Sequence, residues 1–327
     1  MKRAVGRIFQ IPEQANVGII NQALLKVKIN DRKASDLFFF HVFDSDQFQE
    51  RIVDNTHGGA MPNLVGMDTF KNTMLPMPNL PEQRAIAAAL SDVDALISSL
   101  DRLISKKRAV KTAAMQQLLT GKRRLPGFSG EWETKLLGDV GAFQSGNGFP
   151  VAFQGEVSGY YPFFKVSDMN NVGNSTYMVN ANNRITDSVR KQVRAYTFPG
   201  NSIVFAKIGA AVFLERKRLL LQDSCIDNNM MGFLVDETAV DIKFIYYLFL
   251  RIELGKLVSA TALPSLSGKD IANLEIVLPP IEEQTAIATV LSDMDAEIGA
   301  LEARREKTRR IKQGMMQELL TGRTRLA

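Results

Sequence analysis

The chain has few of the residues that build the commonest catalytic and metal centres. Its 327 residues include one cysteine and two histidines, too few for an internal disulfide, a Cys/His zinc site or a histidine-based triad. The longest apolar run, residues 244–250, is far shorter than the roughly 20 residues of a membrane-spanning helix. Residues 1–14 lack the apolar core of a signal peptide. These absences predict a protein of the reducing cytoplasm.

Motifs for cofactor binding and catalysis are also missing. Residues 143–148 superficially resemble a glycine-rich cofactor loop, but Pro150 and polar turns follow where such a loop needs a helix, so a turn is favoured. Neither a phosphate-binding Gly-x-x-x-x-Gly-Lys-Ser/Thr motif nor the Asp-Pro-Pro-aromatic motif of adenine methyltransferases is present. Glu215 and Lys217 have a nuclease-like spacing without a matching acidic pair, which favours a solvated turn. The sequence therefore predicts no active site.

The bulk composition is that of ordinary globular protein. The chain is 45% hydrophobic and 23% charged, and its length suggests about two domains. A net charge of +5 and a pI of about 9.2 are compatible with a nucleic-acid partner, although this signal is weak by itself.

A long internal repeat organises the chain. The segment 82–125 returns without a gap as 283–326, and about half of the positions are identical. Prolines precede each copy, and each ends in Leu-Leu-Thr-Gly, with glycine in the usual place for a helix stop. The repeat predicts two equivalent long helices.

Apolar residues in both copies recur at heptad spacing, which predicts a stripe that packs against another helix. The stripe residues are Ile86, Leu90, Val93, Ile97, Leu100 and Ile104 in the first copy, and Ile287, Leu291, Met294, Ile298 and Leu301 in the second. Arg305 then interrupts the second stripe. Because each stripe needs a partner, we expect the copies to pack on each other as an antiparallel coiled coil.

Residues 133–277 have the pattern of a strand-rich domain with many Gly, Asn and Pro turns. The strongest predicted strands are 160–166, 196–198, 202–208 and 230–235, and 242–254 is predicted to be a helix. In the N-terminal segment, 37–43 reads as a strand or short helix and resembles 244–249, whereas 57–60 reads as a loop. The first segment therefore resembles the rear half of the domain that follows.

The cations of residues 165–218 are interleaved with tyrosines and amides, in a pattern typical of a nucleic-acid surface. Scattered surface charge is the alternative for any single residue. The candidate DNA-binding residues are Asn147, Lys165, Arg184, Arg190, Lys191, Arg194, Lys207 and Arg216.

These motifs resemble the specificity subunit of type I restriction–modification systems. The matching pattern is Leu-Pro-Pro-x-x-Glu-Gln-x-Ala-Ile-Ala-x-x-Leu-Ser-x-x-Asp at 278–295, with a degenerate copy at 77–94. Further landmarks are 128–132, 163–169 and 198–203. The resemblance implies mixed α/β target-recognition domains, each reading half of a split DNA target, joined by two long conserved helices packed as an antiparallel coiled coil.

The resemblance also implies a division of labour. Methyltransferase subunits would dock on the helices, a restriction subunit could join them, and S-adenosylmethionine, Mg²⁺ and ATP would belong to those partners, with no cofactor, metal or catalytic residue in this chain. The expected parts are the rear of a first recognition domain at 1–77, a long helix at 78–125, a complete second recognition domain at 126–277 and a second long helix at 278–327.

Other interpretations remain open at this point. The chain could be a natural half-sized subunit, a truncated gene product or a late-called start, and a half-sized subunit would have to form a homodimer to hold two intact readers. It could instead be a coiled-coil adaptor that binds protein without reading DNA, or a self-contained methyltransferase or nuclease.

Overall fold

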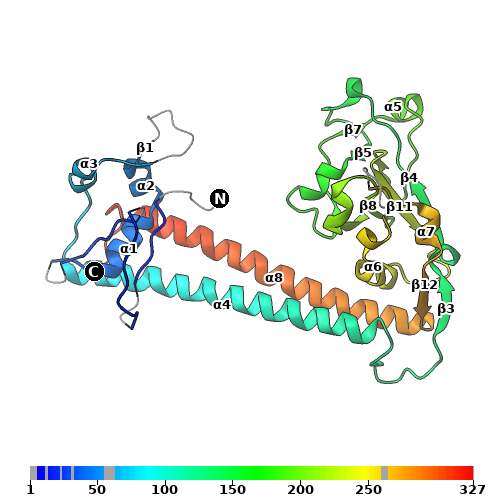
Figure 1. Ribbon diagram of the computed structural model, residues 1–327, viewed down its shortest axis with the longest axis horizontal. Helices are drawn as coiled ribbons and strands as arrows, with labels where there is room; N and C mark the ends of the chain where they lie inside the picture. The colour runs from blue at the N-terminus through cyan, green and yellow to red at the C-terminus, as the bar shows by residue number, and fades with distance from the viewer. Residues whose placement is uncertain are drawn as a thin grey trace. The chain divides into compact units, whose positions relative to one another are not determined.

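The computed structural model describes residues 6–11, 14–22, 24–30, 33–54, 63–258 and 264–326. They form two compact units, the first of Met1–Lys107 with Glu297–Ala327 and the second of Arg108–Ala296. Each unit contains part of helix α4 (Leu80–Leu118) and part of helix α8 (Ile281–Leu319), seen in cyan and orange in Figure 1. Within the described ranges, no helix combines the length and apolarity needed to cross a membrane.

The two long helices begin and end as the repeat predicts. Asn79 caps α4 by accepting a hydrogen bond from the backbone N–H of Glu82 at 3.0 Å. After each helix, Gly121 and Gly322 adopt the left-handed conformation, with φ of 67° and 74°. A glycine there tolerates this conformation without steric cost, so the predicted stops are confirmed.

The first unit contains a few short elements beside its helix segments. They are α1 (Asp36–Asp44), α2 (Asp46–Ile52), α3 (Met67–Lys71) and the antiparallel pair β1 (Val53–Asp54) and β2 (Asn63–Leu64). Ser35 and Ser45 cap α1 and α2 with their side chains. The apolar cluster of this unit joins Phe38 and Val42 of α1 to Ile86, Leu90 and Leu319 of the long helices.

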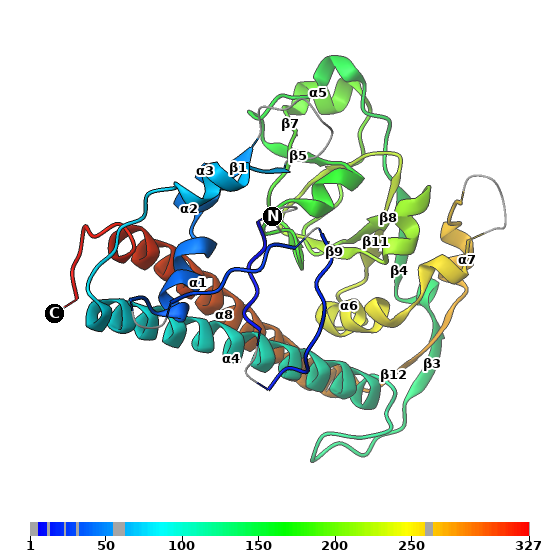
Figure 2. The ribbon, with the colours of Figure 1, turned by 60° about the vertical axis from the view of Figure 1, so that its left-hand side comes forward.

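The second unit is built on a five-stranded sheet. Its order is β4 (Gly141–Ser145), β11 (Met230–Val235), β8 (Ile203–Ala206), β9 (Lys217–Leu220) and β6 (Tyr177–Met178), antiparallel except for β9 with β6. Figure 2 shows β4, β11 and β8 side by side. Strand β11 lies inside the sheet, between β4 and β8, and its first four residues are buried, which explains its unbroken apolar sequence.

Smaller pairings complete this unit. Strand β5 (Tyr161–Phe164) lies between β10 (Cys225–Ile226), to which it is parallel, and β7 (Arg184–Ile185), to which it is antiparallel. Strand β3 (Glu133–Leu136) pairs with β12 (Glu275–Leu278). The other helices are α5 (Asp187–Gln192), α6 (Ile242–Arg251) and α7 (Gly268–Ala272), with 3₁₀ turns at 137–139, 151–153, 166–170, 210–214 and 254–256.

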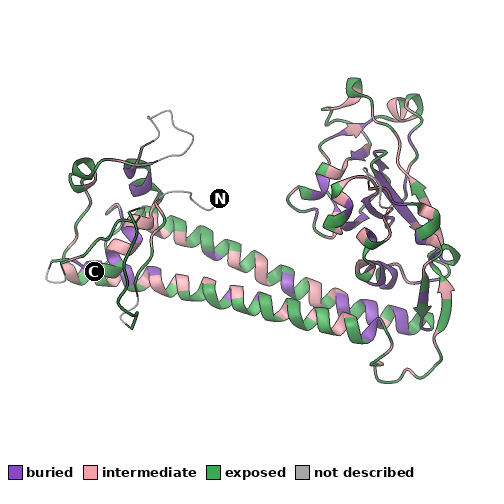
Figure 3. Ribbon diagram, viewed as in Figure 1, coloured by how far each residue is buried: buried purple, intermediate pink, exposed green. Residues whose placement is uncertain are grey.

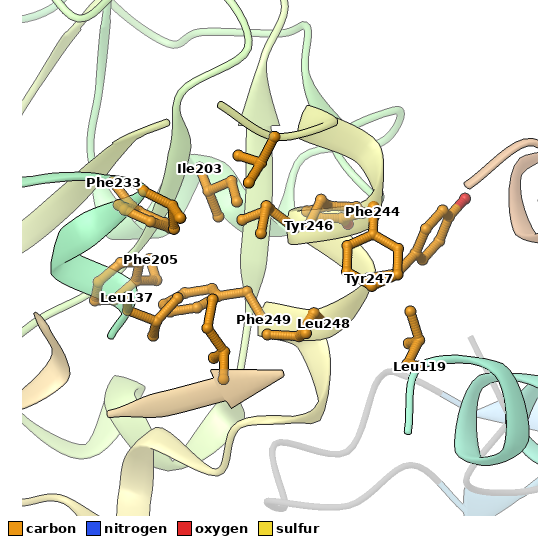
Figure 4. Close-up of a cluster of buried hydrophobic side chains, with 14 of the residues drawn as sticks. Leu119, Leu137, Ile203, Phe205, Phe233, Phe244, Tyr246, Tyr247, Leu248 and Phe249 are labelled. Carbon is orange, nitrogen blue, oxygen red and sulfur yellow. The ribbon is translucent and has the colours of Figure 1, made fainter. Parts of the chain in front are cut away.

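Helix α6 connects the sheet to the helix pair through the main core of the second unit. Phe244 and Phe249 are fully buried, and they pack with Phe205 and Phe233 of the sheet (Figure 4). The same cluster includes Leu118, Leu119, Ile287 and Leu291 of the long helices. In Figure 3 the buried positions of α6 are purple.

Four sequence predictions need correction or comment. Residues 196–198 form no strand; Phe198 makes only an isolated bridge with Ser224, because the Tyr196 N–H bonds to the side chain of Asn147 instead. The predicted helix 242–254 ends at Arg251, and residues 37–43 belong to a helix rather than a strand. The predicted loop at 57–60 lies outside the described residues.

The division into two compact units falls inside the long helices. The reason is that the two ends of each helix pack on different apolar clusters. Ile86 and Leu90 belong to the cluster of the first unit, whereas Leu118 and Leu119 belong to that of the second.

Candidate nucleic-acid interface

Two parallel strands of the second unit end at the same edge and bring a lysine and a carboxylate together. Lys165 directly follows β5 and Asp227 directly follows β10, and the Asp227 N–H bonds to the Phe164 carbonyl at 2.9 Å. Residues after the carboxyl ends of parallel strands commonly form ligand-binding edges in α/β proteins. Lys165 is half-buried and its ammonium donates to Oε1 of Gln154 at 2.9 Å.

Buried carboxylates hold this edge in shape. Asp168 accepts from the Lys165 N–H at 2.7 Å, and Asp227 accepts from Asn229 through both its backbone and its side chain at 3.2 Å. Burial raises the pKa of both Asp168 and Asp227. No group of three or more His, Cys, Asp or Glu residues among the described residues could hold a metal ion. We therefore assign the two carboxylates to loop structure.

The ends of β4 and β8 extend the same edge. Lys207 follows β8, its N–H bonds to the Asn229 carbonyl at 2.7 Å, and its ammonium donates to Oγ of Ser145 at 3.0 Å. Asn147, just beyond β4, bridges to Asp227 and accepts from the Tyr196 N–H at 2.8 Å. This brings together Asn147, Lys165 and Lys207 from the sequence-based candidates.

Arg194 lies two residues before Tyr196 and is exposed, with a positive φ of 52°. Its backbone carries this strain inside a tight turn that follows α5, closed by a bond from Arg194 N–H to the Lys191 carbonyl. Tyr196 itself is 41% exposed. We define the loop edge as Asn147, Lys165, Arg194, Lys207 and Asn229.

The cations of the loop edge keep their charge available. In the described part of the chain, Lys165, Arg194 and Lys207 form no ion pair, and the acceptors of the two lysines are neutral. A neutral acceptor holds an ammonium in place without cancelling its charge, so Lys207 retains its attraction for phosphate. The charge of Lys165 also acts on the nearby carboxyl groups of Asp168 and Asp227.

The other candidates are held by local contacts. Arg190 and Lys191 both pair with Asp187, at 2.8 and 2.7 Å, and Arg190 also stacks on Tyr161. Arg184 donates to the carbonyls of residues 159 and 160, at 2.7 and 2.8 Å. Arg216 donates to the side chain of Asn170. Of these four, Lys191 contacts the loop edge through its backbone, because its carbonyl accepts from the Arg194 N–H at 3.1 Å.

The asparagines that suggested base-reading are mostly structural. Asn174 is 1% exposed, and its side chain makes four hydrogen bonds, to Asp168, Val179 and Asn180. Asn183 accepts from the Gly155 N–H at 2.8 Å. Sequence reasoning missed Asn229, although its place in a polar turn between two apolar strands, β10 and β11, was a usable signal.

The helix pair is antiparallel within each unit, as its cross-helix contacts show. In the first unit Asp94 pairs with Lys312 at 2.7 Å and Asp101 with Arg305 at 2.8 Å, so numbers rise on α4 as they fall on α8. In the second unit Lys111 pairs with Asp295 at 2.5 Å.

The apolar stripes lie largely inside these packings. Burial is complete or nearly so for Ile86, Leu90, Leu100, Ile104, Ile287, Leu291 and Ile298, and partial for Val93, Ile97, Met294 and Leu301. At the interruption, Arg305 reaches Asp101 from a position that aligns with Ile104 of the first copy.

Comparison with known proteins gives one consistent family. The family model described as "Type I restriction modification DNA specificity domain" matches residues 3–106 and 129–309. The type I restriction enzyme MjaVIII specificity subunit of Methanocaldococcus jannaschii is 25% identical over 327 residues, covering 94% of this chain and 75% of that protein. The EcoBI specificity subunit of Escherichia coli is 24% identical over 314 residues, covering 87% of this chain and 64% of that protein.

Solved structures share the fold. The S subunit of a type I restriction-modification system from M. genitalium matches with a TM-score of 0.58 at 15% identity, covering 89% of this chain and 74% of that one. A chain from a structure described as the basis of complex assembly and conformational transition of a type I R-M system has a TM-score of 0.57 at 19% identity, covering 90% and 73%. The mixed α/β architecture with two long helices predicted from the sequence is therefore confirmed.

Proposed function

Because this chain belongs to the family of type I restriction modification DNA specificity domains, we propose that it binds double-stranded DNA through the loop edge of its second unit. One observation carries the proposal: Lys165 and Lys207 lie at one loop edge, and neither forms an ion pair among the described residues. The exposed Arg194 lies two residues before Tyr196, whose N–H bonds to Asn147 of the same edge. Phosphate attraction supplies most non-specific affinity for DNA, and unpaired cations on one edge provide it.

Sequence readout would come from the amides between these cations. The Oδ1 of Asn147 is used by the Tyr196 N–H, which leaves its NH₂ group as a donor. The NH₂ group of Asn229 is used by Asp227, which leaves its Oδ1 as an acceptor. A fixed donor and a fixed acceptor at one edge can distinguish bases by their hydrogen-bonding groups in the major groove.

The helix pair would serve as the docking surface for methyltransferase subunits, and a restriction subunit could join the assembly. In this division of labour the chain selects the DNA target, and the partners supply S-adenosylmethionine, Mg²⁺, ATP and the catalytic groups. The described residues contain no cluster that competes with this assignment as a metal centre.

The decisive experiment is a methylome of cells that express the chain together with its methyltransferase subunit. We expect adenine methylation at one defined motif that disappears when this chain is omitted. Methylation by the purified chain alone, with cofactor supplied, would overturn the assignment to a non-catalytic subunit. DNA binding that hardly changes with salt would favour a protein-binding adaptor instead.

Two further parts of the proposal concern the state of the chain in the cell. Self-association would cover residues 24–30, which form neither helix nor strand and where Leu24, Leu25 and Val27 are 56%, 42% and 44% exposed. Light scattering with and without the methyltransferase subunit tests this, and a monomer in both samples excludes it.

A cytoplasmic location agrees with the single free cysteine, Cys225, and fractionation of tagged cells would test it.

A further inference from the structure

Each repeat of the helix pair anchors a short helix in the same way. In the first unit, Oε1 of Gln83 accepts from the N–H of Ser35, the N-cap of α1, at 2.9 Å. In the second unit, Oε1 of Gln284 accepts from the N–H of Asp241, the N-cap of α6, at 3.0 Å. The two glutamines are equivalent positions of the repeat, so α1 and α6 have equivalent anchors.

One aromatic ring on each short helix also contacts residues of the long helices. In the second unit the Tyr247 hydroxyl donates to Oδ2 of Asp295 at 2.8 Å and lies 3.3 Å from Oγ of Ser292. Lys111 pairs with the other oxygen of Asp295 at 2.5 Å and lies 5.0 Å from the centre of the tyrosine ring. Tyr247 follows its N-cap residue by the same number of positions as His41 follows Ser35.

The first unit repeats this arrangement with an imidazole. Nε2 of His41 lies 3.2 Å from Oγ of Ser91, and its Nδ1 lies 3.9 Å from Oδ2 of Asp94. Lys312 pairs with Asp94 at 2.7 Å. Ser91 and Asp94 are the repeat equivalents of the serine and aspartate around Tyr247, and Lys312 is the equivalent of the lysine.

The buried apolar residues of the two arrangements are also equivalent. Phe38 and Ile86 are each 1% exposed in the first unit, and Phe244 and Ile287 are each 0% exposed in the second. Tight packing of this kind resists small rotations of the docked helix. The main chemical difference between the two arrangements is therefore the ring itself, an imidazole at His41 and a phenol at Tyr247.

We propose that His41 and Tyr247 are equivalent positioning residues, which set how the segment attached to α1 and the domain attached to α6 are oriented on the helix pair. We further infer that the His41 arrangement loosens in mild acid whereas the Tyr247 arrangement does not. This rests on the proposed function, because orientation on the helices decides whether a DNA-reading edge can meet its half of a split target.

The charges around His41 give the direction of the pH effect. Asp94 on α4, Asp44 on α1 and Lys312 on α8 face the ring, and the backbone of Ala87 also contacts it. Burial, and then the positive charge of Lys312, lower the pKa of His41 despite the two carboxylates. A proton on His41 would place a second cation beside Lys312 at a side chain that is 1% exposed.

Tyr247 has no such transition in the physiological range. Burial is the main cause that raises the pKa of its hydroxyl, so the group stays neutral and keeps donating to Asp295 from acid to mild base. The sequence thus places a titratable ring in one arrangement and a non-titrating ring in its counterpart.

The test measures orientation directly, with pairs of spin labels on the full chain. Met67→Cys with Leu103→Cys reports the first unit, and Val172→Cys with Ala296→Cys reports the second, all at exposed positions. The native thiol, Cys225, gives little background because it is buried and its pKa is raised to about 11. Because the pKa of His41 is lowered, label distances are measured by electron paramagnetic resonance in steps from about pH 7.5 to about pH 4.5.

We expect the distance distribution of the first pair to broaden or shift in acid, and that of the second pair to stay constant. His41→Tyr should abolish the change in the first unit, and Tyr247→His should create one in the second. A wild-type distribution that does not depend on pH, or a His41→Tyr distribution that still does, overturns the inference. If Tyr247→His does not fold, the His41→Tyr comparison still decides.

A DNA-binding measurement separates this inference from the proposed function. Label distances need no DNA, so they remain informative even if the chain binds none. If the distances respond as expected while a generic duplex shows no salt-dependent binding by fluorescence anisotropy, the proposed function fails and the positioning role stands.

Discussion

Arg325 donates from Nε and Nη2 to the two carboxylate oxygens of Glu82, both at 2.5 Å, across 243 residues of sequence. The equivalent residues of the other repeat, Arg124 and Glu283, make the same two-pronged contact at 2.6 Å. Each pair ties the turn after one long helix to the first turn of the other. The planar guanidinium matches a carboxylate in this geometry, so lysine would be a poor substitute.

The Glu82 contact should make the chain sensitive to acid. The hydrogen bond from Arg325 lowers the pKa of Glu82 below its usual value of 4.5. The resulting stability is present above that value and is lost as pH falls through the lowered pKa. We expect Arg325→Ala to reduce the Tm at neutral pH and to flatten the loss of Tm below about pH 4.5.

Thermal unfolding followed by circular dichroism measures this effect. Arg323→Ala is the matched control, since Arg323 is 72% exposed and lies 4.0 Å from its carboxylate partner. An Arg325→Ala protein with the wild-type Tm and the wild-type acid profile would contradict the assigned role.

Removal of single cations from the loop edge should weaken DNA binding in a salt-dependent way. For Lys165→Ala, Arg194→Ala and Lys207→Ala, we expect the slope of log affinity against log salt to fall by about 0.9 per lost phosphate contact. Lys191→Ala is the control, because its charge is already paired with Asp187 at 2.7 Å. Fluorescence anisotropy over a salt series gives the slopes, and equal losses for Lys191 and Lys207 would argue against the edge.

Arg305 can be replaced by isoleucine, the residue at the equivalent position of the other repeat, Ile104. Its Nε is buried without a hydrogen-bond partner, while its Nη1 pairs with a half-exposed Asp101. Because such pairs contribute little and an unsatisfied donor is costly, we expect Arg305→Ile to be neutral or to stabilise by about 1 kcal/mol. Urea unfolding measures this, with Arg305→Ala as the variant that leaves the space unfilled; a loss of stability in Arg305→Ile alone would count against the prediction.

Gly232 is required by a close approach in strand β11. A Cβ there would lie 2.4 Å from Cε1 of Phe198, a fully buried ring. We expect Gly232→Ala to destabilise the second unit by about 1–3 kcal/mol through overpacking. Denaturant unfolding tests this, and Phe198→Leu in the same protein should recover part of the loss; an unchanged midpoint in Gly232→Ala would show that the ring can move aside.

Local sequence signals predicted the periodic elements well, because helix and strand patterns depend on neighbours along the chain. The repeat predicted helices at both of its copies, and the apolar run 230–235 is strand β11 with the same limits. The pattern failed at 196–198, where a distant side chain, Asn147, takes the hydrogen bond that a strand partner would need.

The sequence by itself determined which groups carry charge, where the repeat lies and which residues face a partner helix. Tertiary structure alone decided which cations remain available, since Lys191 shares the Asp187 carboxylate with Arg190 while Lys207 donates to the hydroxyl of Ser145. It also decided that His41 and Tyr247 occupy equivalent places. The physical reason is that a charge or a hydrogen bond depends on atoms within about 3 Å, and those atoms can come from any part of the chain.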